Sequence, residues 1–253
     1  MKKGALFGIF LRSLFIAAAL NFRRMQNLGF AYAMMPVIRK KQDTAAETDE
    51  RLTRHLQMFN THPYLSTPLI GSLVRMEEEQ DGPDGASSVE MVKKSLSGPY
   101  AAIGDTFFWG ALRPCGGIVA VALSGLGWAL APLAFLLIYT PAHIWVRTQG
   151  FLEGYRRGKQ GVEFVRRMDL PRIAGRLRWI SLVVLAAWGG WLAQRFPVSA
   201  EGIPSPAAAP AALAVVVICW MLIRKGVSQV YILYGAMILF LVMASREWLV
   251  FWK

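Results

Sequence analysis

The chain has 253 residues, of which 55% are hydrophobic, including nine Trp and fourteen Phe. Its apolar residues gather into runs too long and too uncharged for the core of a soluble domain, which excludes an ordinary soluble globular fold. The net charge is +12, and the Lys and Arg residues cluster beside those apolar runs. Membrane topology therefore accounts for the positive charge, and we expect no nucleic-acid partner.

Residues 1–40 begin with MKKGALFGIFLRSLFIAAAL, which has the charged start and apolar run of a signal peptide. Arg12 interrupts that run. Apolar residues recur at helical spacing between the basic ones, so we predict an uncleaved amphipathic helix on the cytoplasmic face of the membrane.

Residues 41–97 are polar and are expected to lie in the cytoplasm or at the membrane surface. Thr44 and Glu47 form a capping-box pattern, which predicts a helix that ends before Pro63. A second helix is expected from Thr67-Pro68, because proline favours the first position of a helix. Residues 81–85 predict a turn, and Ser87 with Glu90 predicts a third helix start.

Residues 98–146 begin with GPYAAIGDTFFWGALRP and continue as a long apolar stretch. The glycines and prolines of this motif predict re-entrant or broken membrane helix, which is tolerated only inside protein or beside a cavity. The stretch Cys115–Val146 is too long for one straight crossing. It predicts either two helices bent near Pro132 or Pro141, or one strongly tilted helix.

The C-terminal part, residues 179–253, contains three further apolar segments: Trp179–Ala193, Pro206–Ile223 and Val227–Ala244. Each comes close to the roughly 20 residues that a membrane crossing requires. Residues 147–178, which precede them, contain nine Lys and Arg against three Asp and Glu. The positive-inside rule therefore predicts a basic cytoplasmic loop, three crossings after it, and a C-terminus outside the cytoplasm.

Asp105 is the residue that most needs an explanation, because an ionised carboxylate at membrane depth costs at least roughly 2.5 to 3.5 kcal/mol. Trp109 follows one helical turn later on the same side. A carboxylate beside an aromatic ring is a common arrangement for holding a sugar, so one interpretation is a substrate path. The alternative is structural, in which Asp105 caps a helix or pairs with Arg113.

Five motifs, in order, are similar to one known family. They are NFRRMQNLGFAYAMMPVIRK (21–40), RHLQMFNTHP (54–63), MEEE (76–79), GPYAAIGDTFFWGALRP (98–114) and GYRRG (154–158). Together they resemble the IID subunit of mannose-family sugar phosphotransferase systems. The resemblance implies an all-α, multipass protein of the bacterial inner membrane, which pairs with a IIC subunit in a trimer of IIC–IID pairs. It also implies that a hexose is imported while cytoplasmic IIB, supplied by IIA, phosphorylates it.

The resemblance adds further candidate residues. Asn60 and Thr61 are site candidates at the end of a helix, and helix capping alone would also explain them. His62 is an interface or structural candidate; in the family IIB carries the phosphoryl group, so we do not expect His62 to be phosphorylated. Glu77 and Glu78 match the family's paired acids. We expect Glu77 to face a partner or a polar path and Glu78 to lie on an interface or in solvent.

The sequence has no catalytic motif of its own, so we expect no activity from the chain alone, no cofactor and no metal. His55 and His143 lack any supporting pattern. Against the family pattern, the segment after the first C-terminal helix is short and a few motif residues differ. These differences leave one alternative: a membrane scaffold or regulatory protein that kept the IID fold without transport.

Overall fold

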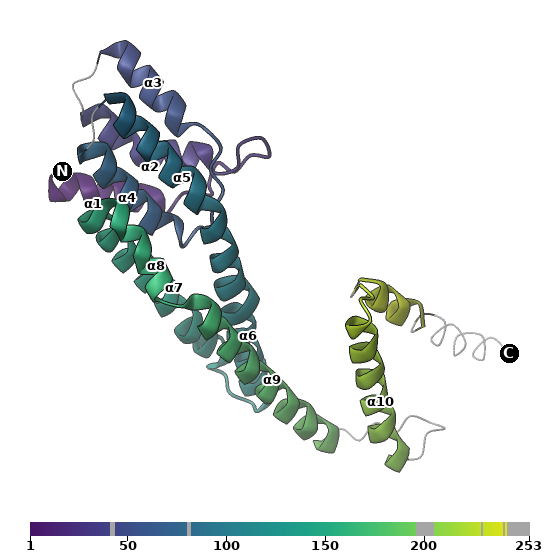
Figure 1. The fold of residues 1–253 in the computed structure, drawn as a ribbon. Helices are drawn as coiled ribbons and strands as arrows, with labels where there is room; N and C mark the ends of the chain where they lie inside the picture. The colour runs from purple at the N-terminus through teal and green to yellow at the C-terminus, as the bar shows by residue number, and fades with distance from the viewer. Residues whose placement is uncertain (41–43, 80–81, 196–204, 229, 240, 242–253) are drawn as a thin grey trace, which may run out of the picture. The chain divides into compact units, whose positions relative to one another are not determined.

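The computed structural model describes residues 1–40, 44–79, 82–195, 205–228, 230–239 and 241 (Figure 1). Across them the chain is helical, with two isolated β-bridges and no strand, so the predicted all-α class is confirmed. The chain divides into two compact units, Met1–Trp188 and Gly189–Lys253, and each is described by itself.

The helices are, in chain order, α1 (Lys3–Ser13), α2 (Asn27–Lys40), α3 (Ala45–His55), α4 (Ser66–Glu79), α5 (Gly82–Gly104), η1 (Asp105–Leu112), α6 (Arg113–Gly125), α7 (Ala131–Arg157), η2 (Gly158–Val162), α8 (Glu163–Arg167), α9 (Leu170–Arg195) and α10 (Ser205–Arg224). Of these, η1 is a π-helix and η2 a 3₁₀-helix. The second unit also contains a short apolar helix, Val230–Leu239.

The first helices start where the sequence predicts. The backbone N–H of Thr44 donates to the Glu47 carboxylate at 2.8 Å, and the N–H of Glu47 donates to Thr44 Oγ1 at 3.4 Å, which completes the capping box of α3. Helix α4 begins at Ser66 and holds Pro68 in its first turn. Helix α3 ends at His55, well before Pro63. The ammonium of Lys93 donates hydrogen bonds to the backbone carbonyls at the C-terminus of α3, those of Arg54 at 3.3 Å and His55 at 3.2 Å, and so stabilises the end of the helix there.

The expected turn at 81–85 and the expected break at Gly98-Pro99 are corrected by the structure. Helix starts at Gly82, and α5, η1 and α6 follow one another without interruption. Within the described residues, the stretch Asp84–Gly125 is the one helix long and apolar enough to cross a membrane. Pro99 removes one hydrogen bond at a cost of about 3 kcal/mol, whereas a break in an apolar medium would leave several backbone groups unsatisfied.

The stretch Cys115–Val146 forms a hairpin, one of the arrangements left open by its length. Helix α6 ends at Gly125 and α7 starts at Ala131, with Pro132 in its first turn and Gly127 in the left-handed region (φ +84°) of the turn. The basic loop predicted over residues 147–178 is corrected by the structure, because these residues are mostly helical. Helix α7 continues to Arg157, and α9 already begins at Leu170. Charge density predicts which side of a membrane a segment occupies, not its backbone conformation.

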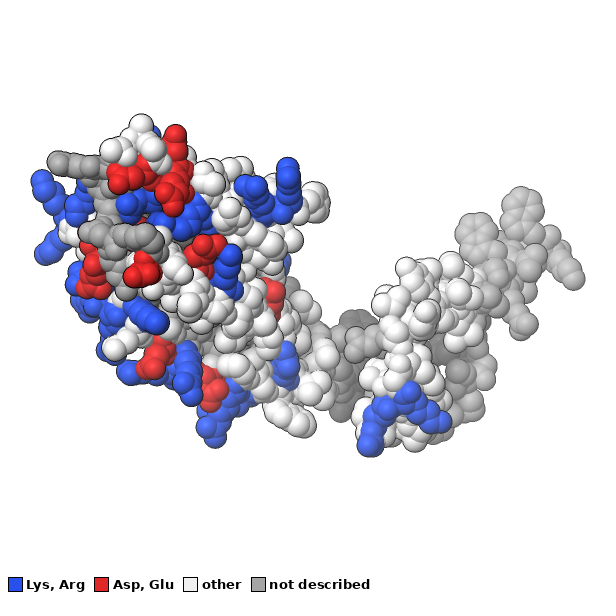
Figure 2. Space-filling view, turned by 45° about the horizontal axis from the view of Figure 1, so that its top comes forward, with Lys and Arg blue, Asp and Glu red and all other residues white. Residues whose placement is uncertain are grey.

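Lys, Arg, Asp and Glu side chains crowd one part of the first unit, and much of the rest of the visible face carries few of them (Figure 2). Large apolar side chains are exposed on α6, α7 and α9; Val121, Leu137 and Val183 are each more than 60% exposed. An apolar surface of this extent is typical of a protein that contacts lipid or a partner.

Helices α4 and α7 cross at very short range through glycines. A Cβ on Gly71 of α4 would lie 2.3 Å from the Phe151 carbonyl oxygen, and one on Gly154 of α7 would lie 2.3 Å from the Pro68 carbonyl oxygen. A Cβ on Gly150, one turn before Gly154, would lie 2.4 Å from Cγ of the Pro68 ring. The spacing of Gly150 and Gly154 is the GxxxG pattern that lets two helix backbones approach closely.

We predict that Gly154→Ala lowers the free energy of unfolding by about 1 to 3 kcal/mol, because the added methyl group must push the α4 backbone away. The matched control is Gly117→Ala in α6, where nothing lies within 4 Å of the added Cβ. That change should be neutral or stabilise by about 0.5 to 1 kcal/mol. Thermal unfolding of the detergent-solubilised protein measures both; equal midpoints for the two variants would show that the crossing is not tight.

Candidate functional site

The segment between α3 and α4 is held in place by side-chain amides from the start of α2. Gln26 Nε2 donates to the Thr61 carbonyl at 2.8 Å, and the Thr61 N–H donates back to Gln26 Oε1 at 3.1 Å. Asn27 Nδ2 donates to the Leu56 carbonyl at 2.9 Å. Two sequence motifs far apart in the chain therefore form one clamp, which fixes the backbone just before His62.

His62 is buried between this clamp and the long helix. Its ring stacks on Phe108 at 5.1 Å between centroids and lies 4.7 Å from the Trp109 ring. Its close approach requires a glycine at position 104, since a Cβ there would lie 2.3 Å from His62 Cβ. The glycine of the Gly104-Asp105 pair is thus explained, because only a residue without a side chain leaves room for the imidazole.

The protonation of His62 follows from its surroundings. Burial, and then the positive charge of Arg147, lower the pKa of His62 to about 4, so the ring is neutral near pH 7. Its Nδ1 accepts a hydrogen bond from the Tyr64 N–H at 3.2 Å, which leaves the proton on Nε2. Within the described residues neither Nε2 of His62 nor Oγ1 of Thr61 has a hydrogen-bond partner, although both atoms are buried.

An aromatic cluster continues from His62 to α7. The hydroxyls of Tyr64 and Tyr139 lie 3.0 Å apart, and Tyr64 stacks on His143 at 4.6 Å. The guanidinium of Arg147 lies over the Tyr64 ring, 4.5 Å from its centre. Tyr139, His143 and Arg147 are spaced four residues apart and therefore share one face of α7. His143, which has no supporting pattern in the sequence, belongs to this cluster.

Asp105 and Trp109 lie in the π-helix η1, which spans eight residues. The π-helix is rare and is found frequently at functional sites. Asp105 is exposed and Trp109 is 48% exposed, so both side chains are accessible, and the Trp109 ring lies against the buried His62. Within the described part of the chain no ion pair joins Asp105 to Arg113, and Arg113 is also exposed. The geometry therefore lends no support to the structural pairing of these two residues.

Glu77 lies against α3 instead of facing a path or a partner. Its carboxylate is 2.9 Å from Arg51 Nη1, 2.8 Å from Arg54 Nη2 and 3.1 Å from His55 Nε2, and its side chain is 2% exposed. Burial opposes its ionisation, but His55 and Arg54 outweigh burial and lower the pKa of Glu77 to about 2. Three side chains of α3 thus reach the Glu77 carboxylate, which the sequence alone does not show.

Glu78 is an ion-pair centre as well. It lies 2.6 Å from the N-terminal ammonium and 3.0 Å from Lys40 Nζ, and it accepts a hydrogen bond from the Tyr155 hydroxyl at 2.6 Å. It therefore joins α1, α2 and α7.

Asn60 is exposed, beside the buried Thr61. Among the described residues no three His, Cys, Asp or Glu side chains gather as a metal site requires.

Comparison with known proteins identifies the family. Residues 1–200 match the family model described as PTS system mannose/fructose/sorbose family IID component. The chain is 30% identical over 261 residues to the fructose permease IID component of Bacillus subtilis, with 94% of each chain covered. This chain belongs to that IID family.

Other relatives and solved structures agree. The mannose-specific EIID component of Escherichia coli K12 is 35% identical over 156 residues, which cover 60% of this chain and 54% of that one. The sorbose-specific component of Klebsiella pneumoniae is 36% identical over 162 residues, covering 62% and 58%. The fold is similar to a structure titled "Structure of membrane protein" (TM-score 0.73, 26% identity). It is also similar to a complex of the mannose transporter ManYZ with microcin E492 (TM-score 0.57, 25% identity); both matches cover 97% of each chain.

As a IID component, the chain is a helical membrane protein. Its structure packs His62 against Trp109 and against Gly104, the residue before Asp105, and it places Glu77 and Glu78 in ion pairs of their own. The α7 residues of the cluster were not predicted as site residues, although their spacing of four is visible in the sequence. Lys93 was not predicted either; it follows Val89 by four residues and so shares its buried face, and it is 2% exposed.

We predict that Glu77→Gln lowers the free energy of unfolding by about 3 to 5 kcal/mol, because it leaves two partly buried guanidinium groups facing a neutral amide. Glu79→Gln is the control, since Glu79 pairs with Arg75 in the open and is 51% exposed. It should change the stability by less than about 1 kcal/mol. Chemical denaturation of the purified protein measures both, and equal losses would contradict a buried ion-pair centre.

The same ion pairs predict that the free energy of unfolding depends on pH. The folded pKa of Glu77, about 2, lies below its ordinary value of 4.5, so the stability that it contributes is present above pH 4.5. That contribution should be lost progressively as the pH falls from 4.5 toward 2. Thermal unfolding at a series of pH values should show a loss in this window that is smaller in the Glu77→Gln variant. A loss of equal size in both would exclude Glu77 as its source.

Proposed function

We propose that this IID component imports a hexose together with a IIC subunit, in a trimer of IIC–IID pairs, while phosphorylated IIB, supplied by IIA, transfers its phosphoryl group to the sugar. Family membership supports the proposal, as does the likeness to a mannose transporter structure. The observation that carries it at residue level is the packing of His62 against Trp109 in the same π-helix that begins with Asp105. The chain itself contributes part of the substrate path and no phosphorylated residue.

The chemistry of these three residues suits a sugar. The carboxylate of Asp105 accepts hydrogen bonds from hydroxyls, and the neutral imidazole of His62 retains an unpartnered N–H donor within the described structure. The Trp109 ring is half exposed and offers an apolar face for the C–H side of a sugar ring. Small-molecule sites typically combine apolar and aromatic walls with a few such polar groups. Thr61 Oγ1, buried and unpartnered in the described residues, adds a hydroxyl beside them.

Exposed aromatic and apolar side chains support assembly with IIC. The ring of Phe22 is fully exposed at the tip of a loop closed by two backbone hydrogen bonds between Asn21 and Met25. Large aromatic side chains held in a fixed loop are typical anchors of protein interfaces. The exposed apolar faces of α6, α7 and α9 offer further surface for IIC or lipid.

The scaffold alternative is favoured by one feature of the sequence, the short segment that follows the first C-terminal helix. Most of that segment (196–204) lies outside the described residues. Neighbouring genes for IIA, IIB and IIC would support transport, and their absence would support the alternative.

We predict that Asp105→Asn and Trp109→Ala reduce hexose uptake while leaving copurification with IIC intact. Loss of a charge-assisted hydrogen bond worth about 1.5 to 3 kcal/mol should weaken uptake about tenfold or more in Asp105→Asn. Trp109→Ala should raise the sugar concentration needed for half-maximal uptake. The measurements are radiolabelled hexose uptake and affinity copurification with IIC from the same cells.

Two matched substitutions control for general damage. Asp84→Asn neutralises an exposed carboxylate on the same continuous helix, and Trp128→Ala removes an exposed tryptophan from the α6–α7 turn. Neither should reduce uptake. Normal uptake in both Asp105→Asn and Trp109→Ala, or loss of IIC from the complex in either, would overturn the path role.

We also propose a location in the bacterial inner membrane with a cytoplasmic N-terminus and an extracytoplasmic C-terminus, on the basis of the basic residues of segment 147–178. In a background of Cys115→Ala and Cys219→Ala, we predict that Gln160→Cys is labelled only from the cytoplasmic side. Trp128→Cys, in the turn at the other end of α7, should be labelled by an impermeant maleimide from outside. Labelling of position 160 by the impermeant reagent in intact cells would reverse the orientation.

A further inference from the structure

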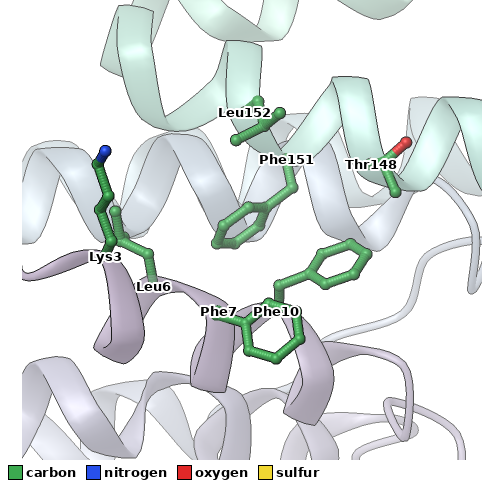
Figure 3. Close-up of a pocket in the computed structure, with 7 residues that line it drawn as sticks. All are labelled: Lys3, Leu6, Phe7, Phe10, Thr148, Phe151 and Leu152. Atoms are coloured by element: carbon green, nitrogen blue, oxygen red, sulfur yellow. The ribbon is translucent and has the colours of Figure 1, made fainter.

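A groove with apolar walls lies between α1 and α7 (Figure 3). It encloses about 410 Å³ and is lined from α1 by Lys3, Leu6, Phe7 and Phe10, and from α7 by Thr148, Phe151 and Leu152. The rings of Phe10 and Phe151 meet at its floor, 5.6 Å apart. None of these residues belongs to the site around His62.

The groove has one charged end. Lys3 lies at one end and Thr148 at the other, with the phenylalanine rings between them (Figure 3). The Thr148 hydroxyl donates to the Ile144 carbonyl at 2.9 Å, so its polar atom is satisfied within its own helix. Lys3 is exposed, and no ion pair joins it to an acidic residue in the described part of the chain. The single cation is therefore available to a ligand.

The surroundings of the groove match the surface of a membrane. Lys3, Phe7 and Leu11 recur every four residues and form one exposed stripe of α1, with Phe7 62% and Leu11 41% exposed. The opposite side of α1 buries Ile9 and Ser13 in the fold. A helix with one apolar stripe and basic residues at its end lies in the interface plane, at the level of lipid headgroups.

We propose that this groove binds one acyl chain of an anionic phospholipid, whose phosphate group contacts Lys3. An apolar groove with a single cation at one end is complementary to an amphiphile with a single anionic end, because its walls bury CH₂ groups of the acyl chain while Lys3 meets the anion. A helix of a protein partner would fill the apolar walls equally well, but it matches Lys3 only if an acidic side chain or its C-terminus falls there, whereas a phospholipid has its anionic group at the end of its acyl chains by construction. The site needs no step of sugar transport, so it stands independently of the proposed function.

Native mass spectrometry of the complex co-expressed with IIC tests the proposal. Phosphatidylglycerol and phosphatidylethanolamine with identical acyl chains serve as the two probes. We expect a preference for phosphatidylglycerol that falls about fivefold in Lys3→Gln, the size expected for one Lys near a lipid surface. Lys2→Gln removes the same charge from a residue that does not line the groove, and it should leave the preference unchanged.

A second pair of variants tests the apolar walls. Leu152→Trp fills the groove and should reduce the binding of both lipids, whereas Leu137→Trp, on an exposed position of the same helix, should not. Unchanged lipid binding in Leu152→Trp overturns the proposal. Loss of IIC from Leu152→Trp with lipid binding unchanged would show that the partner covers the groove. An equal effect of Lys2→Gln and Lys3→Gln would reduce the role of Lys3 to general surface charge and would also overturn it.

Discussion

The glycine-lined crossing of α4 and α7 is the constraint on which the rest of the first unit depends. Gly71, Gly150 and Gly154 allow two backbones to touch where any larger residue would separate them. Because α4 begins just after Tyr64, this contact also sets the distance between Tyr64 and the face of α7 that bears Tyr139 and His143. The aromatic cluster therefore follows from this backbone packing, whereas the side-chain amides of Gln26 and Asn27 fix the backbone just before His62.

Two kinds of polar group serve different purposes in this fold. The carboxylates of Glu77 and Glu78 are each surrounded by positive charges from other helices, so they hold α1, α2, α3 and α7 around α4. Nε2 of His62 and Oγ1 of Thr61 are buried without a hydrogen-bond partner within the described residues, and so are Nε of Arg54 and Nδ1 of His143. Buried polar atoms are normally satisfied. His62 differs from the others in that it lies against the half-exposed indole of Trp109, and for this reason we propose it as part of a ligand site.

Much of the architecture could be predicted from local chemistry. The capping box at Thr44 and the proline-led start of α4 were readable, because each depends on residues within one helical turn. The partner of Glu77 and the continuity of the helix through Pro99 were not, since each depends on packing between segments far apart in the chain. For the site, the sequence identified Asp105, Trp109 and His62 but not Tyr64 or Arg147, whose roles depend on where α4 and α7 cross. The π-helix has no local signal that we could identify.

The segment before α4 and the helix η1 meet where His62 packs on Phe108 and Trp109, and we propose that they form a wall of the sugar path. The sharpest test is a cryo-electron microscopy structure of the assembled IIC–IID complex with hexose bound. We expect sugar density against the Trp109 ring and within hydrogen-bond distance of the Asp105 carboxylate or His62 Nε2. Density contacted by IIC residues alone, with Trp109 and Asp105 turned toward lipid or a protein interface, would contradict it.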